Sequence, residues 1–149
     1  MKMRNSKIIF ALLVLVTIVS CEKRKLAREL ENNIYGEWLG LHIANTTYSN
    51  GNPPSNHEFF IRLTFFDDNS ASYVSNIDSL NYYWRIYENL GQIYLAADTD
   101  TTTNYSRIHK FNIIETSDKN QLWQLRIIRN EGEENETITT LSWDLDKVQ

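Results

Sequence analysis

The chain has 149 residues, the size of one typical domain. It carries 15 basic and 19 acidic residues; the first 20 residues hold three of the bases and no acid, so residues 21–149 carry a net charge of −7. This balance argues against nucleic-acid binding and against charge-driven binding to an anionic membrane. A single cysteine excludes an intrachain disulfide and a zinc cluster of thiolates, and the aromatic content argues against disorder for most of the chain.

The N-terminus has the pattern of an export signal. Three positive charges in residues 1–7 precede an apolar run, residues 8–19, that is broken only by Thr17. A membrane-spanning helix needs about 20 apolar residues, whereas a shorter run behind a basic segment is typical of a secretory signal peptide. The end of this segment, Ile18-Val19-Ser20-Cys21, resembles the bacterial lipobox, a motif that ends at a lipidated cysteine.

The lipobox resemblance implies that residues 1–20 are removed and that Cys21 becomes the mature N-terminus, acylated on its sulfur and its amine by chains such as palmitate. Two or more acyl chains anchor a protein stably in a membrane. The alternative is a plain thiol at Cys21 behind a short membrane anchor. We expect a cell-envelope protein anchored to the outer membrane, with the periplasmic face and the cell surface both left open.

A tether and a short helix are expected over residues 21–35. Apolar residues recur there at helical spacings, at Leu26, Ala27, Leu30 and Ile34. We expect this helix to plug one end of the domain that follows, and the alternative is a frayed linker.

From Gly36 onward the apolar period changes to strict alternation, which is typical of strands with one buried face. Eight strands are expected, over residues 37–47, 57–66, 71–77, 80–87, 92–97, 105–116, 121–129 and 136–145. Their connections are short, so neighbours should pair antiparallel. The pattern favours an all-β fold, an up-and-down eight-stranded barrel that closes on itself. A two-sheet sandwich is the alternative.

The segment Gly36-Glu37-Trp38, placed between the helix and the first strand, resembles the Gly-x-Trp motif of the lipocalin and calycin superfamily. The whole plan is similar to that of the small lipocalin-like lipoproteins of bacteria. Residues 63–70 are similar to their second hairpin, and residues 82–84 to the aromatic-rich strand that follows. The resemblance implies a lipocalin-like barrel domain over residues 36–149.

Trp38 is expected to cap the core at the closed end of the barrel. The family packs a basic residue across this tryptophan, and Arg126 and Arg129 are the candidates for that position. Because Leu39 and Leu41 beside Trp38 are also apolar, we expect the first strand to be buried on both faces, against the helix.

The sequence has no catalytic or metal-binding signature. His42, His57 and His109 belong to different expected strands and are interpreted as surface or loop-edge residues; a two-histidine site would depend on barrel geometry. The acidic pairs within residues 67–68 and 98–100 are explained by turn chemistry. We expect no enzymatic activity, no metal and no cofactor.

Two functions remain open. The first is a monomeric, lipid-anchored barrel that binds a small apolar or amphipathic ligand, lined by inward residues of the alternation: Trp38, Phe59, Ile61, Leu63, Phe65, Tyr82, Trp84, Trp123, Leu125 and Trp143. The second is an interaction module that holds a protein or glycan on an outer aromatic strip, Tyr83, Arg85 and Tyr87. A cavity of several hundred Å³ would favour the first function, and a densely packed interior the second.

Overall fold

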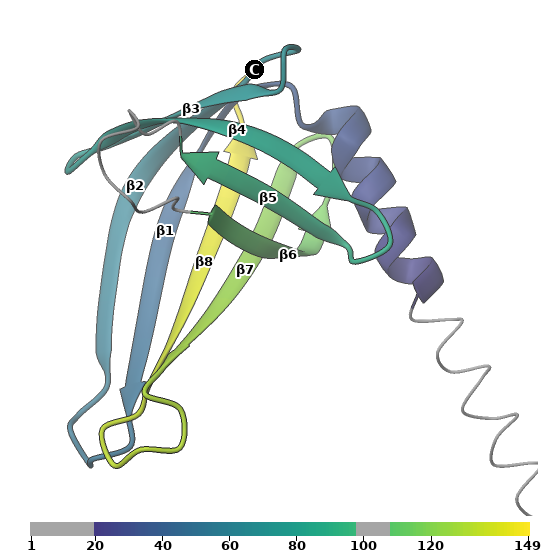
Figure 1. Ribbon diagram of the computed structural model, residues 1–149. Helices are drawn as coiled ribbons and strands as arrows, with labels where there is room; N and C mark the ends of the chain where they lie inside the picture. The colour runs from purple at the N-terminus through teal and green to yellow at the C-terminus, as the bar shows by residue number, and fades with distance from the viewer. Residues whose placement is uncertain (1–19, 98–107) are drawn as a thin grey trace, which may run out of the picture.

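The computed structural model describes residues 20–97 and 108–149. A helix over residues 20–33 leads into eight strands (Figure 1). No helix within the described residues is long and apolar enough to cross a membrane. The strands are β1 (Gly36–Tyr48), β2 (Ser55–Phe65), β3 (Ser70–Ser75), β4 (Ser79–Tyr87), β5 (Gln92–Ala97), β6 (Ile108–Thr116), β7 (Asn120–Arg129) and β8 (Thr137–Lys147).

The sheet closes into a barrel in which each strand pairs with its neighbour in sequence. All eight ladders are antiparallel, including the closing ladder in which Gly40 lies opposite Leu145. The expected up-and-down barrel is therefore confirmed, and the two-sheet sandwich is excluded. Closure gives each of the eight strands a partner on both sides over at least part of its length.

The strand boundaries differ from the expected ones in ways that turn chemistry explains. The third strand was expected to reach Ile77, but β3 ends at Ser75, whose hydroxyl accepts hydrogen bonds from the backbone N–H groups of Ile77 and Asp78 at 3.2 and 2.9 Å. The expected polar loop over residues 98–104, the start of the sixth strand at 105–107 and the apolar run 8–19 lie outside the described residues.

The strands fall into a long set and a short set. β1, β2, β7 and β8 extend well beyond β3–β6 as a four-stranded sheet (Figure 1). At this end the β2–β3 ladder reaches only to Ile61 opposite Ser75, and the β6–β7 ladder only to Asn112 opposite Gln124. The long and short sets therefore part from each other at one end of the barrel, which we call the open end.

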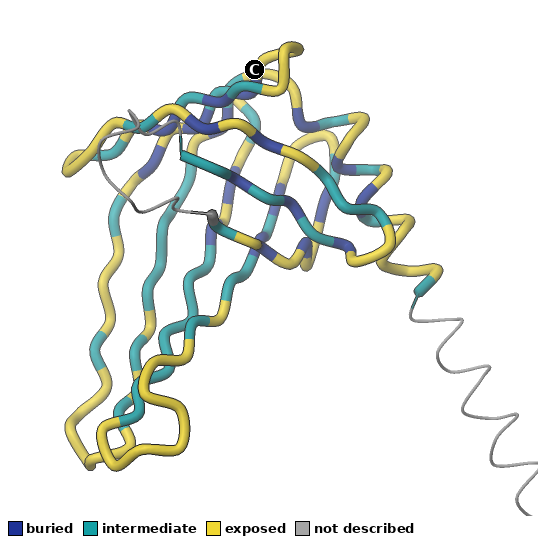
Figure 2. The backbone as a smooth tube through the Cα atoms, viewed as in Figure 1, coloured by how far each residue is buried: buried dark blue, intermediate teal, exposed yellow. Residues whose placement is uncertain are grey.

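The opposite, closed end is sealed by the N-terminal helix. Ala27, Leu30 and Ile34 are fully buried in the barrel core, as the helical spacing predicted (Figure 2). Arg28 fixes the same helix to the β4–β5 turn by an ion pair with Glu88, Nε to Oε2 at 2.9 Å. The expectation that the helix plugs one end of the barrel is confirmed.

The expectation that β1 is buried on both faces is wrong. Leu39 is 41% exposed on the outer face, while the inward Trp38 is 1% exposed. The reason is the position of the helix, whose apolar residues enter the barrel end and join the core instead of covering the outer face of β1.

Candidate functional site

A cavity of about 510 Å³ lies inside the barrel at its open end. Its walls come from both strand sets, because the strands part where their ladders stop. The lining residues are His42, Phe59, Tyr73, Ser75, Ile77, Asp78, Leu80, Tyr82, His109, Phe111, Arg129, Leu141 and Trp143. The volume lies within the range of about 300–1,000 Å³ that small-molecule sites occupy.

The ten residues expected to face a ligand divide between this cavity and the packed core. Phe59, Tyr82 and Trp143 line the cavity. Leu125 is partly buried and packs against the core. The other six are buried in the core: Trp38, Ile61, Leu63, Phe65, Trp84 and Trp123. Alternation thus placed all ten on the inner face, but it carries no information on where along the barrel the interior changes from filled to hollow.

Several lining residues were missed by the sequence interpretation. Tyr73, Phe111 and Leu141 belong to the inner faces of β3, β6 and β8, and the alternation contains the signal that could have found them. Ile77 and Asp78 come from the β3–β4 turn, where the alternation of inward and outward side chains does not apply and gives no prediction.

The interpretation of His42 and His109 as surface or loop-edge histidines is wrong, because both line the cavity; His57 is exposed, as expected. The His42 ring stacks on Phe59, with centroids 4.4 Å apart and planes inclined by 21°. The Nε1–H of Trp143 donates a hydrogen bond to Nδ1 of His42 at 3.0 Å. The His42 imidazole is therefore held on one face by Phe59 and at its Nδ1 atom by Trp143.

The Trp143 bond also fixes the tautomer of His42. An indole N–H can only donate, so Nδ1 of His42 must accept, and the proton of the neutral ring lies on Nε2. Burial, with a smaller contribution from nearby His109, lowers the pKa of His42 below its ordinary value of 6.5. At neutral pH the cavity is thus lined by an uncharged imidazole whose Nε2–H is a hydrogen-bond donor.

Aromatic rings form one wall of the cavity. Trp143 lies nearly parallel to Tyr73, at a centroid distance of 5.7 Å and an angle of 26°, and Phe111 lies 4.5 Å from Trp143 at 37°. The rings of Tyr82 and His109 meet in a T-shaped arrangement, with centroids 6.1 Å apart and planes inclined by 70°. Burial raises the pKa of the Tyr73 phenol, so Tyr73 remains uncharged well above neutral pH. Flat apolar faces with a few polar groups are typical of small-molecule sites.

The closed end carries the Gly-x-Trp tryptophan and its basic partner. The Nε1–H of Trp38 donates to the backbone carbonyl of Ile34 at 2.7 Å, which ties the helix end to β1. The partner across the ring is Lys147, whose Nζ lies 5.1 Å from the Trp38 ring centroid and donates to the carbonyl of Asn33 at 3.0 Å. The assignment of this position to Arg126 or Arg129 is wrong, because both lie in the half of β7 toward the open end.

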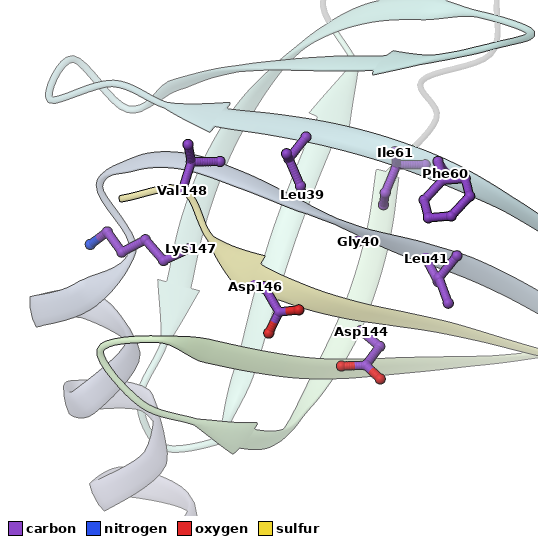
Figure 3. Close-up of a pocket in the computed structure, with 9 residues that line it drawn as sticks. All are labelled: Leu39, Gly40, Leu41, Phe60, Ile61, Asp144, Asp146, Lys147 and Val148. Atoms are coloured by element: carbon purple, nitrogen blue, oxygen red, sulfur yellow. The ribbon is translucent and has the colours of Figure 1, made fainter.

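A second hollow, of about 550 Å³, lies on the outside of the barrel. Figure 3 shows its apolar side, formed by Leu39 and Leu41 of β1 and Phe60 of β2, and its acidic side, formed by Asp144 and Asp146 of β8. Phe60 is 78% exposed, so this hollow is a valley on the outer surface and not an enclosed site. The open-end cavity differs from this valley because its lining includes the buried inward side chains Tyr73, Phe111 and Trp143.

The expected outer aromatic strip is present. Tyr83 is 58% exposed, and the ring of Tyr87 packs at 4.2 Å on that of Tyr94. Two cations cover this pair, because the Arg85 guanidinium lies 5.3 Å from Tyr87 and the Lys110 ammonium 5.0 Å from Tyr94. The strip is therefore largely occupied by its own cation–π contacts.

Among residues 20–97 and 108–149 there is no group of three or more His, Cys, Asp and Glu residues that could hold a metal ion. Cys21 is exposed in the first turn of the helix. A comparison of the chain with protein-family models, curated proteins and solved structures gave no match.

Proposed function

We propose that this chain is a lipid-anchored, non-enzymatic envelope protein whose lipocalin-like barrel binds a small apolar or amphipathic molecule in the open-end cavity. The observation that carries the proposal is the cavity of about 510 Å³ between an aromatic wall and a histidine pair. An interaction module would need no such space, because a solid barrel would present the same outer surface.

The division of the interior supports this function. The closed end is filled by the helix and by large aromatic residues that include Trp38 and Trp123, so it can hold the fold together without a ligand. At the open end Phe59, Leu80 and Leu141 line the cavity and are only partly buried, so covering them with an apolar molecule would remove apolar surface from water.

Native mass spectrometry of the full-length protein, released from the envelope in mild detergent, tests the proposal. We expect an additional bound mass that disappears in Leu141→Trp, which fills the cavity from β8. The matched control is Ile128→Trp, at an outer position of the neighbouring strand β7, and it should retain the mass. An unliganded protein that takes up nothing from lipid extracts would refute the proposal and favour an interaction surface around Phe60 or Tyr83.

The anchor is tested separately. The lipobox resemblance and the exposed position of Cys21 support lipidation at that residue. We expect Cys21→Ser to abolish incorporation of labelled palmitate and to release or mis-sort the protein. Ser20→Ala preserves a small residue before the cysteine and should leave labelling unchanged. Unchanged membrane attachment in Cys21→Ser would show that residues 8–19 are themselves the anchor.

A further inference from the structure

The start of the helix and the β4–β5 turn lie side by side at the closed end (Figure 1). Lys23 lies one helical turn before the buried Ala27 and packs on this turn at Gly91, where an added Cβ would come within 3.0 Å of the Lys23 Cβ. Arg28 forms its ion pair with Glu88 of the same turn. The first turns of the helix are therefore fixed to the barrel and do not form a loose tether.

This start of the helix is positively charged, although the chain as a whole is acidic. Lys23, Arg24 and Lys25 follow one another and have one acidic neighbour, Glu22, so residues 21–25 carry a net charge of +2. All three cations are exposed, and neither of the two ion pairs found in the described part of the chain includes them. Their charge is therefore available to a partner outside the chain.

An exposed apolar side chain lies beside these cations. Leu90 precedes Gly91 in the β4–β5 turn and is 47% exposed. Basic residues beside an exposed apolar residue suit the surface of a lipid bilayer, where the charges meet phosphate groups and the apolar side chain enters the acyl boundary. We call Lys23, Arg24, Lys25 and Leu90 the anchor-side surface.

The proposed anchor brings a membrane to this surface. A helix rises 1.5 Å per residue, so Lys25 lies about 6 Å along the axis from Cys21, and Ala27 about 9 Å. The potential of an anionic leaflet extends over about 8–10 Å at physiological ionic strength. The cations therefore lie within reach of anionic headgroups if Cys21 is lipidated. The same holds if residues 8–19 are the anchor, because that run ends just before Lys23.

We propose that the anchor-side surface docks on anionic lipid headgroups, so that the barrel rests directly on the membrane with the β4–β5 turn toward it. This inference rests on the proposed attachment to a membrane and adds a second contact that orients the barrel. The charge of the whole chain cannot attract the protein to such a membrane, but the anchor supplies the attachment. Residues 26–149 carry a net charge of −9, so an anionic leaflet repels the rest of the domain and favours the one basic surface.

Spin-label accessibility in the full-length protein, reconstituted into vesicles, tests this orientation. Acylation consumes the only thiol of the chain, so Leu90→Cys supplies the one site for a thiol-specific label. We expect a water-soluble nickel complex to reach this label less in vesicles of phosphatidylglycerol and phosphatidylcholine than in vesicles of phosphatidylcholine alone. Each neutralised cation should lower the ratio of docked to undocked protein about fivefold, so Arg24→Gln with Lys25→Gln should remove the difference.

Two matched controls accompany this experiment. Val74→Cys places a label at a similar exposure, 42%, near the end of β3 that leads to the open end, and its accessibility should be the same in both vesicles. Lys110→Gln with Arg126→Gln removes the same charge from exposed positions of β6 and β7 and should leave the label at position 90 protected.

The outcomes separate docking from anchoring. Equal accessibility of the label at position 90 in both vesicles would overturn the docking while the anchor stands, and so would equal effects of the two double variants. Uptake of label by the unchanged protein would overturn lipidation of Cys21 alone, and the docking would then be measured in Cys21→Ser. A protein that does not enter vesicles would overturn both proposals.

Discussion

Lys147 is the residue that fastens the helix to the closed end of the barrel, and Lys147→Met tests this role. Methionine preserves the apolar stem but removes the ammonium, which lies 5.1 Å from the Trp38 centroid and donates to the Asn33 carbonyl at 3.0 Å. That carbonyl belongs to the last helical residue, where a positive charge is also favourable because of the helix dipole.

The expected loss follows from these contacts. A cation–π contact is worth about 0.5–1 kcal/mol at a partly exposed site, and a hydrogen bond from a charged donor about 1.5 kcal/mol. Lys147 is half-buried, so solvent screening reduces the sum to about 1–2 kcal/mol. For a domain of this size such a loss lowers Tm by roughly 4–8 °C.

Circular dichroism during heating measures this loss, and hydrogen exchange of residues 20–33 locates it. We expect the helix to exchange faster in Lys147→Met than in the unchanged protein, before the strands are affected. Lys119→Met is the control, since Lys119 is exposed in the β6–β7 turn and carries the same charge. The argument is refuted if both variants unfold at the same temperature, or if helix exchange is unchanged in Lys147→Met.

Three further predictions concern the barrel closure, the helix and the cavity. Gly40→Ala would place a Cβ 1.9 Å from the backbone oxygen of Asp144, so β1 and β8 must separate; we expect a loss of about 3 kcal/mol in urea denaturation. Leu30→Ala empties a fully buried site between helix and barrel and should cost about 2–5 kcal/mol in the same assay. Because burial and His109 lower the pKa of His42, the unfolded chain binds a proton that the folded protein does not as the pH falls below 6.5; stability should therefore fall from pH 7 toward pH 5. His42→Gln should flatten that fall in thermal unfolding followed across the same pH range.

The fold could be predicted because one local rule, the period of two, determines which residues face inward. β5 was predicted at its observed bounds, and the inward set of β2 and β4 was correct. Lys147 was missed as the partner of Trp38 because the last strand was expected to end at residue 145, before Lys147. Its role depends on the β1–β8 register, in which it lies opposite Trp38, and a register across the closure of a barrel is not a local property.

The cavity could not be predicted for a related reason. His42 and His109 are 67 positions apart on strands that do not pair, and only closure of the sheet places them around the same space. Both histidines point inward by the same alternation that places Trp38 or Ile93 in the packed core. The pattern therefore cannot distinguish a residue that lines a cavity from a residue of the packed core. What distinguishes them is the position at which the β2–β3 and β6–β7 ladders stop.

The two ends of the barrel therefore divide stability and binding between them. Most fully buried large side chains, among them Trp38, Leu30 and Trp123, lie at or near the helix-sealed end, where packing contributes stability whether or not a ligand is present. At the open end, strands that have separated from their neighbours give up ladder hydrogen bonds and leave Phe59, Leu80 and Leu141 only partly buried, which costs stability. A protein selected for stability alone would gain by filling that end with larger side chains. The open end instead contains a cavity and a histidine held by a tryptophan at its wall, and a polar imidazole suits a ligand better than a core.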